Sequence, residues 1–197
     1  MQHDASDDCL TGKLIYLMGP SGAGKDSLIE AARPVLQGQG VMIARRVITR
    51  SAEAKGEEAQ GVTPQQFELL CSQNAFALHW QANGLSYGIP VQIDAWLKDG
   101  RHVLVNGSRA HLSEARVRYP NLLPVLLTVD AGVLRQRLLG RARESLDDIE
   151  RRLERSRALA CAQDYTVHAL DNSGELRDAV SRLLALLRQE GVLAAEV

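Results

Sequence analysis

A glycine-rich stretch directly after a short apolar run constrains the fold of this chain most. Residues 13–18 (KLIYLM) suit a buried strand, residues 19–26 read GPSGAGKD, and an apolar helical pattern runs from Leu28 to Val35. A strand, a glycine loop and a helix in this order form a phosphate-binding loop, where backbone N–H groups and the helix N-terminus hold phosphate oxygens. We therefore predict an ATP site in which Lys25 reaches the β- and γ-phosphates. The predicted ATP contacts are Gly19, Pro20, Ser21, Gly22, Ala23, Gly24, Lys25, Asp26 and Ser27.

The end of this loop departs from the usual pattern. A Ser or Thr normally follows the lysine and ligates Mg²⁺, whereas here Asp26 follows Lys25 and Ser27 comes one residue later. Two interpretations of Asp26 stay open: a carboxylate that favours the helix dipole, or a carboxylate that is itself the Mg²⁺ ligand. Many phosphate-loop kinases place a metal-associated Asp where the apolar run 102–106 ends, and this chain has Asn106 there. We hypothesise that the carboxylate near the metal has moved from the strand end to the loop.

Strand and helix patterns alternate along the rest of the chain. Apolar runs at 41–44, 102–106 and 122–129 are typical of parallel strands, and 166–170 is a last short strand. We expect helices at about 64–71, 90–97, 111–119, 131–140, 146–162 and 174–189, a hairpin at 76–89 and a loop at 51–62. This order predicts a doubly wound α/β domain at 13–190, with a polar N-terminal tail at 1–12 and a C-terminal tail at 191–197.

Composition narrows the compartment and the partners. The chain has 197 residues, 45% of them hydrophobic, and a formal net charge of -1, which predicts neither a nucleic-acid nor a membrane partner. Its three cysteines are too few and too scattered for a disulfide framework, residues 1–12 do not form a signal peptide, and no apolar run could span a bilayer. A cytoplasmic protein is expected. Arginine supplies 19 of its 23 basic residues, which is either compositional bias or a preference for phosphate-rich ligands.

These features together resemble the guanylate kinase superfamily of phosphate-loop kinases. The resemblance is carried by GPSGAGK, Thr49-Arg50, Tyr87-Gly88 and the segment RQRLLGRARES. It implies a three-layer α/β fold with a parallel central sheet and a small acceptor-binding insertion, here at 51–90. It also implies an arginine-rich lid at 137–146, whose catalytic candidates beside Lys25 are Arg137, Arg141 and Arg143.

The acceptor segment departs from guanylate kinases at the positions that read guanine. By spacing, Arg46 stands where those enzymes have a Ser, Gln81 where they have a Glu, and Ile89 where they have a Ser or Thr. Glu53 stands where a second phosphate-binding arginine is expected. A site built to hydrogen-bond guanine does not tolerate such losses, which argues against GMP as the acceptor.

The strings GPSGAGKDSL, RRVITR, HWQANGLSYGIP and VNGSRAHL resemble instead the ribose 1,5-bisphosphate phosphokinases of the same superfamily. That resemblance implies transfer of the ATP γ-phosphoryl group, with Mg²⁺, onto ribose 1,5-bisphosphate, giving 5-phospho-α-D-ribose 1-diphosphate and ADP. Such enzymes are associated with phosphonate breakdown. The candidate acceptor-binding residues are Arg46, Arg50, Gln81 and Tyr87.

Several alternatives stay open at this point. A nucleoside monophosphate kinase with altered base choice is one, and a non-catalytic binding module is another, although such modules usually lose the phosphate loop. His79 and Trp80 either flank the acceptor or pack the hairpin, and the charged run 151–157 is most simply a solvated helix face. The sequence leaves the assembly open, with a homodimer as one candidate.

Overall fold

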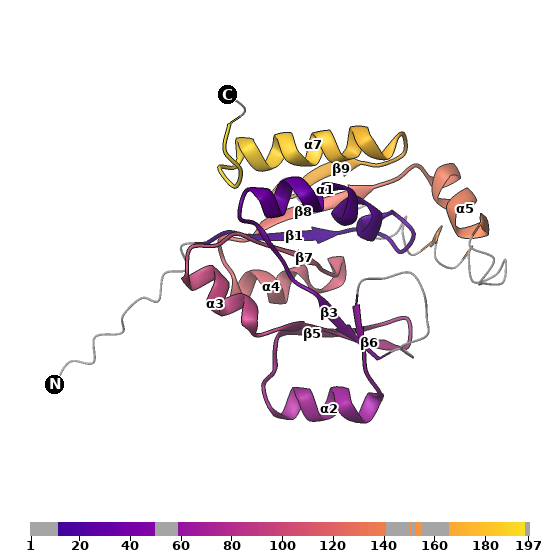
Figure 1. The fold of residues 1–197 in the computed structure, drawn as a ribbon. Helices are drawn as coiled ribbons and strands as arrows, with labels where there is room; N and C mark the ends of the chain where they lie inside the picture. The colour runs from indigo at the N-terminus through magenta and orange to yellow at the C-terminus, as the bar shows by residue number, and fades with distance from the viewer. Residues whose placement is uncertain (1–11, 50–58, 141–149, 151–152, 155–165, 196–197) are drawn as a thin grey trace.

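A computed structural model describes residues 12–49, 59–140, 150, 153–154 and 166–195. Its larger part is a five-stranded sheet in the order β2-β7-β1-β8-β9, with every neighbouring pair parallel (Figure 1). The strands are β1 (Leu14–Met18), β2 (Met42–Ile43), β7 (Val103–Asn106), β8 (Leu123–Thr128) and β9 (His168–Asp171). The predicted doubly wound α/β core is thereby confirmed.

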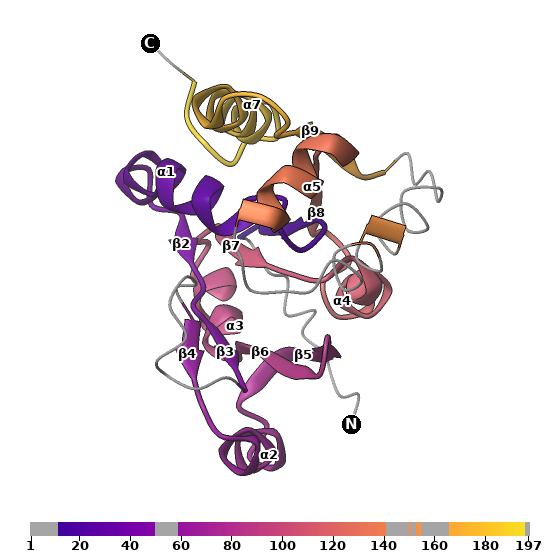
Figure 2. The same ribbon diagram turned by 90° about the vertical axis from the view of Figure 1, so that its right-hand side faces the viewer.

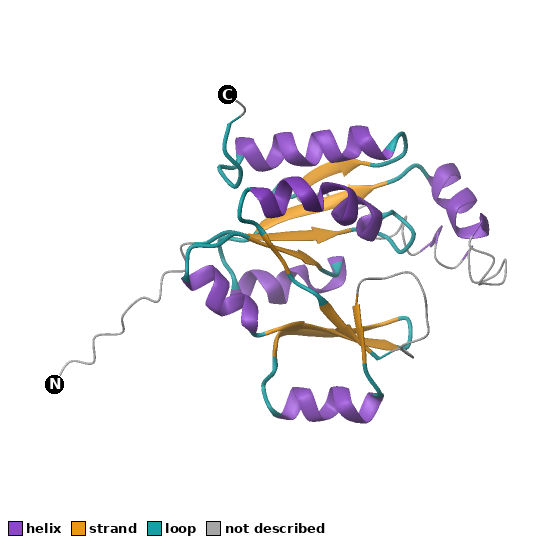
Figure 3. Ribbon diagram, viewed as in Figure 1, coloured by secondary structure: helices purple, strands orange, loops and turns teal. Residues whose placement is uncertain are grey.

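Helices cover both faces of this sheet (Figure 3). Those on one face are α1 (Lys25–Gly38) and α7 (Leu176–Gln189), and those on the other are α3 (Gln92–Lys98) and α4 (Leu112–Arg118). Successive side chains of a strand point to opposite faces, so Ile15 and Leu17 join the core under α1 and α7, whereas Leu14, Tyr16 and Met18 join the core on the other side. Burial on both faces therefore explains why β1 is apolar at every position.

A second, smaller sheet lies beside this core, with the order β4-β3-β6-β5. Its strands are β3 (Arg46–Ile48), β4 (Ala59–Gly61), β5 (Phe76–Ala82) and β6 (Leu85–Pro90), and α2 (Pro64–Ser72) packs against it. The expected hairpin joins β5 to β6, and its turn residues Asn83 and Gly84 both have positive φ, as a type I′ turn requires. Thr63 and Gln66 form a capping box at the start of α2, as its predicted N-terminus requires.

The expectation of a loop over 51–62 is wrong for residues 59–61. These residues form β4, which pairs parallel to β3 at the edge of the small sheet. A three-residue edge strand of Ala, Gln and Gly holds its place through backbone bonds and carries no hydrophobic alternation, so the sequence gives no signal for it. Because β3 belongs to the same sheet, the small sheet starts at Arg46, ahead of the insertion expected at 51–90.

The expected helix at 131–140 is present as α5 (Ala131–Gly140), beyond the carboxyl ends of the central strands (Figures 1 and 2). Residues 141–146 of the expected lid lie outside the described residues. So does most of the helix expected at 146–162, apart from Glu150, Leu153 and Glu154. In the part of the chain that the structure describes, no helix is both long and apolar enough to cross a membrane.

Candidate active site

The glycine loop connects β1 to α1 in the conformation that phosphate binding requires. Gly22 and Gly24 have φ values of 94° and 91°, a left-handed conformation that glycine adopts without strain. Gly24 directly precedes α1, so the loop ends at a helix N-terminus whose N–H groups and dipole favour an anion. Lys25 Nζ donates to the carbonyl oxygens of Gly19 and Pro20 at 2.8 and 3.1 Å. The ammonium group is therefore held over the loop.

A buried asparagine from near the end of the chain fastens this loop. Asn172 follows β9 and is 3% exposed, and its Nδ2 donates to the Ala23 carbonyl at 2.7 Å. A Cβ on Gly24 would lie 2.7 Å from that same nitrogen, so the close approach requires glycine at this position. Sequence analysis missed Asn172. The available signal was a polar residue directly after the last parallel strand, at the carboxyl edge where such sheets bind ligands.

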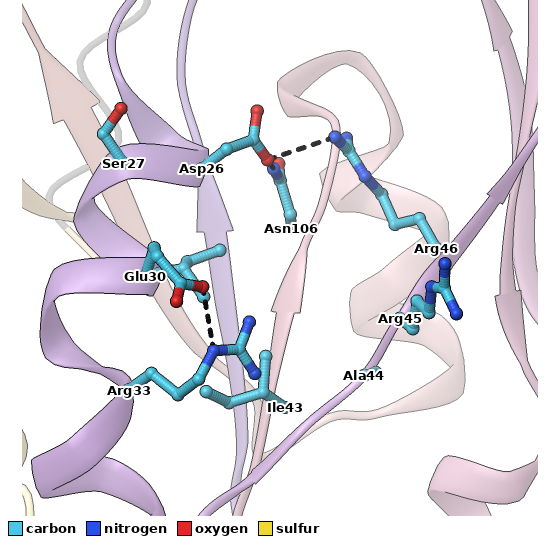
Figure 4. A pocket seen from close by; sticks show the side chains of 10 residues that line it. Asp26, Ser27, Glu30, Arg33, Ile43, Ala44, Arg45, Arg46 and Asn106 are labelled. Atoms are coloured by element: carbon cyan, nitrogen blue, oxygen red, sulfur yellow. Dashed lines mark hydrogen bonds and ion pairs between the residues drawn. The ribbon is translucent and has the colours of Figure 1, made fainter. Parts of the chain in front are cut away.

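Asp26 lies where the phosphate loop, β7 and β3 meet. Its Oδ1 accepts a hydrogen bond from Asn106 Nδ2 at 2.7 Å and lies 3.4 Å from Arg46 Nη2. Asn106 and Arg46 are only 4% and 9% exposed, so buried groups fix this side of the carboxylate. The second Asp26 oxygen points away from Asn106 and Arg46. The Ser27 hydroxyl lies apart from all three side chains (Figure 4). The structure thus brings together Asp26 and Asn106, the two residues that the hypothesis of a relocated carboxylate connects.

A pocket opens beside this cluster, between α1 and the β2–β3 segment (Figure 4). Its volume of about 320 Å³ lies at the lower end of the range typical of small-molecule sites, ~300–1,000 Å³. Three arginines and two carboxylates line it together with apolar and polar residues. The lining residues are Asp26, Ser27, Ile29, Glu30, Arg33, Ile43, Ala44, Arg45, Arg46 and Asn106.

The hairpin supplies an aromatic wall next to Arg46. The Arg46 guanidinium lies 5.6 Å from the centre of the Tyr87 ring, and Tyr87 stacks on Trp80 with ring centres 5.6 Å apart. Trp80 is buried, so it packs the hairpin. The strand register places Trp80 opposite Tyr87 and Gln81 opposite Ser86, so Gln81 points to the other face and is exposed. The structure therefore brings Arg46 and Tyr87 together but leaves Gln81 apart from them.

Helix α5 brings one of the predicted lid arginines to the phosphate loop. Leu134 and Leu138 of α5 pack over Gly22, and Arg137 Nη1 approaches within 3.9 Å of the position that a Cβ on Gly24 would take. That nitrogen is buried and has no hydrogen-bond partner within the described ranges. Arg137 is thus positioned beside the loop. The other predicted phosphate-binding arginines, Arg50, Arg141 and Arg143, lie outside the described residues.

A short turn after β7 carries two further polar side chains that sequence analysis did not assign to the site. It is the 3-10 helix η1 (Arg109–His111), and the buried Tyr16 fixes its start by accepting from the Ser108 N–H and donating to the Ser108 carbonyl. Arg109 Nε and His111 Nδ1 are buried and have no hydrogen-bond partner in the described part of the chain. Burial lowers the pKa of the Arg109 guanidinium. The sequence signal for Arg109 and His111 was their position shortly after the central strand β7.

The loop, the strand order and the pocket together define a phosphate-loop kinase, and comparison with known proteins agrees. The family model for guanylate kinase matches residues 11–190, and the chain belongs to the guanylate kinase family. A guanylate kinase from Anaplasma phagocytophilum has a similar fold, with a TM-score of 0.68 at 18% identity, over 93% of this chain and 88% of that one.

Within this family the chain is similar to proteins of one particular name. It is 62% identical to "Ribose 1,5-bisphosphate phosphokinase PhnN" of Pseudomonas paraeruginosa, over 90% of this chain and 96% of the relative. It is 57% identical to the protein of the same name from Azotobacter vinelandii, over 90% and 97% of the two chains. Each match therefore spans most of this chain and nearly all of the relative.

Proposed function

We propose that this protein is a ribose 1,5-bisphosphate phosphokinase, which transfers the γ-phosphoryl group of ATP to the 1-phosphate of ribose 1,5-bisphosphate. The products are 5-phospho-α-D-ribose 1-diphosphate and ADP. The observation that carries the choice of acceptor is the identity of 57–62% to relatives of that name over nearly their full length. The site supports it, because buried Arg46 stands beside the pocket where guanylate kinases place a small hydroxyl.

On the donor side, residues 19–25 hold the ATP phosphates. The loop N–H groups and the α1 N-terminus bind phosphate oxygens, and Lys25 exchanges its two loop carbonyls for the β- and γ-phosphates. Arg137 approaches the same phosphates from α5, where its buried nitrogen gains an anionic partner. We propose the same role for Arg141 and Arg143.

The residues at the loop fit a magnesium ion bound mainly through phosphates. Mg²⁺ in kinases takes one or two carboxylates together with substrate oxygens and water. Among the described residues no group of three or more His, Cys, Asp or Glu side chains could hold a metal, whereas Asp26 offers the carboxylate oxygen that points away from Asn106. Asp26 would therefore hold the ion. When bound, Mg²⁺ would neutralise negative charge on the phosphates.

On the acceptor side, Arg46 and Tyr87 form the part of the site that the structure describes. Arg46 offers a bidentate guanidinium to a phosphate, and Tyr87 orients it by lying against its face. We retain Arg50 as a further phosphate ligand. Acceptor binding by Gln81 stays a prediction. It would require the hairpin to rearrange, because the Gln81 side chain faces away from Tyr87 in this structure.

The chemistry needs positioning and charge neutralisation rather than a general base. An oxygen of the acceptor 1-phosphate, already ionised at neutral pH, attacks the γ-phosphorus, and the bond from that phosphorus to the β–γ bridging oxygen breaks. The leaving oxygen stays on ADP with the electron pair. Lys25, Arg46 and Arg137 would hold the phosphate groups in line and offset their negative charge.

A panel of acceptors tests this proposal against the nucleotide alternative. ADP release from ATP is followed with ribose 1,5-bisphosphate, GMP, AMP and dTMP under identical conditions. We expect turnover with the sugar bisphosphate and at most background with the nucleotides. Turnover restricted to one nucleotide would establish a nucleoside monophosphate kinase instead. Light scattering on the same preparation measures whether the protein is a homodimer, the candidate assembly that the sequence leaves open. The compartment that we propose is the cytoplasm.

A further inference from the structure

We propose that the pocket between α1 and the β2–β3 segment holds the second phosphate of the acceptor, with Arg33 and Arg45 as its cationic partners. This inference rests on the proposed function and names a subsite of it. The 5-phosphate is the group that separates ribose 1,5-bisphosphate from ribose 1-phosphate. A pocket that reads this phosphate would therefore determine the specificity of the enzyme.

The pocket extends away from the site of phosphoryl transfer along one face of α1. Asp26, Glu30 and Arg33 follow one another at helical spacings of four and three residues and all line the pocket. At a rise of 1.5 Å per residue, the Cα atoms of Asp26 and Arg33 are about 10 Å apart along the helix axis. An acceptor with its 1-phosphate beside Asp26 and Arg46 therefore extends its other end toward Arg33.

Arginines stand on both walls at that far end. Arg33 projects from α1 and Arg45 from the segment that enters β3, on opposite sides of the pocket (Figure 4). Only 20% of the Arg33 side chain is exposed, so its position is set by packing to a degree unusual for a surface arginine. Two guanidinium groups on facing walls suit a phosphate dianion, which accepts planar, bidentate pairs of N–H bonds.

The middle of the pocket is apolar and suits a sugar ring. Ile29 and Ala44 are buried and Ile43 is partly buried, so the wall between the two charged ends is fixed and carries few hydrogen-bonding side chains. These three apolar side chains do not hydrogen-bond the edge of a nucleotide base, which a guanine site needs. An apolar wall with arginines at both of its ends instead matches a small sugar with a phosphate at each end.

Glu30 is the group that opposes an anion in this pocket. It forms an ion pair with Arg33, with Arg33 Nε 2.9 Å from Glu30 Oε2. The Glu30 side chain is 66% exposed, and such exposed pairs contribute little to stability. Water can therefore solvate the Glu30 carboxylate when a phosphate binds to Arg33. Arg45 Nη2 donates a hydrogen bond to the Ala59 carbonyl oxygen at 3.4 Å. This bond is long, so it also restrains the Arg45 side chain only weakly.

Kinetics of the variant Arg33→Gln/Arg45→Gln test the subsite. We expect its KM for ribose 1,5-bisphosphate to rise about 10- to 100-fold, the effect of one or two charged hydrogen bonds, while its KM for ATP stays unchanged. Inhibition by ribose 5-phosphate, which carries only the second phosphate, should weaken by the same factor. Ribose 1-phosphate should compete equally well with both proteins. Arg177→Gln, which removes an exposed, ion-paired helix arginine elsewhere, is the matched control.

Each outcome separates the subsite from the proposed function. An unchanged KM for the sugar bisphosphate, or a parallel rise in the KM for ATP, would overturn the subsite and leave the function standing. If the wild-type enzyme does not turn over ribose 1,5-bisphosphate, the proposed function is wrong. Calorimetric titration with ribose 5-phosphate then decides the subsite: weaker binding by the double variant supports a phosphate site, and equal or absent binding by both proteins refutes it.

Discussion

The Asn106 amide donates a hydrogen bond to Asp26 Oδ1 across 2.7 Å and joins two residues that lie 80 positions apart in the sequence. Asp26 is the unusual last residue of the phosphate loop, and Asn106 ends the strand next to it. The two elements therefore form one polar unit with a single carboxylate. That carboxylate lies on the loop, and the amide lies on the strand end.

Exchanging the two side chains tests whether the position of the carboxylate or only its presence matters. Asp26→Asn should reduce kcat by about 10²-fold or more, because the only carboxylate of the unit is lost, and excess Mg²⁺ should restore part of the loss. Asn106→Asp should also reduce activity, because two carboxylates at this separation cannot both stay ionised. The double variant Asp26→Asn/Asn106→Asp keeps one carboxylate and should recover much of the lost activity. Steady-state kinetics against Mg²⁺ concentration provide the measurement.

A double variant no better than the single variants would show that Asp26 acts from its own place on the loop. Asp26→Ser, which restores the usual loop residue, is the companion variant. It should resemble Asp26→Asn in its dependence on Mg²⁺. Unchanged kinetics in Asp26→Ser would mean that Asp26 only favours the helix dipole, the other interpretation of this residue.

Replacing Lys25 distinguishes an enzyme from a binding module. Lys25→Ala removes the ammonium that lies over the loop, so kcat should fall by about 10²–10³-fold and ATP affinity should decrease. Binding of a fluorescent ATP analogue and ADP release are both measured, with Lys98→Ala on α3 as the control. A Lys25→Ala protein that keeps its full ATP affinity would contradict the proposed donor site.

Arg137 should affect catalysis more than folding. Its Nη1 is buried beside the phosphate loop without a hydrogen-bond partner in the described ranges, so Arg137→Met removes an unpaired buried donor and should not destabilise the fold. The kcat should nevertheless fall about 10²-fold, because the group would stabilise charge on the transferred phosphoryl group. The control is Arg135→Gln, because Arg135 lies on the same helix as Arg137 and forms only an exposed ion pair with Glu150. A loss of thermal stability with normal kcat would assign Arg137 a structural role.

The loop anchor at Asn172 should affect both stability and nucleotide affinity. Asn172→Ala leaves the Ala23 carbonyl without its buried donor, which should lower the free energy of unfolding by about 1–3 kcal/mol. The KM for ATP should rise, since the loop loses its support from β9. Chemical denaturation and initial rates measure the two effects. Asn172→Ala with unchanged stability would show that the loop holds its shape without this bond.

The sequence predicted those parts of the structure that rest on local patterns. The phosphate loop, the buried strands and the hairpin each combine an apolar pattern with glycine or turn residues at neighbouring positions. The proximity of Asp26 and Asn106 could also be anticipated, because parallel strands end at one edge of the sheet. These predictions did not depend on how distant side chains pack.

Other features depend on contacts that no local pattern encodes. Strand β4 exists only because β3 offers it a backbone edge, and the face taken by Gln81 depends on the exact register of the hairpin. Arg33 and Asn172 reach the site because α1 turns one face to the β2–β3 segment and because β9 ends beneath the loop. In the sequence, Arg33 looks like an ordinary surface residue, and only the position of Asn172 after the last strand sets it apart.

Protonation of His102 should weaken the fold in mildly acidic solution. Burial, and then the positive charge of Lys13, lower the pKa of His102 below its ordinary value of 6.5, and its Nδ1 accepts the Lys13 backbone N–H at 3.0 Å. The unfolded chain takes up this proton at a higher pH than the folded chain does. The stabilisation that neutral His102 gives the fold is therefore complete above pH 6.5. It decreases as the pH falls from there toward the folded pKa. His102→Asn keeps an acceptor but does not titrate, so its stability should depend less on pH between about 5 and 7.5. His102→Ala should show the same flat profile at lower stability, and a wild-type slope that persists in His102→Asn would assign the pH dependence to other groups.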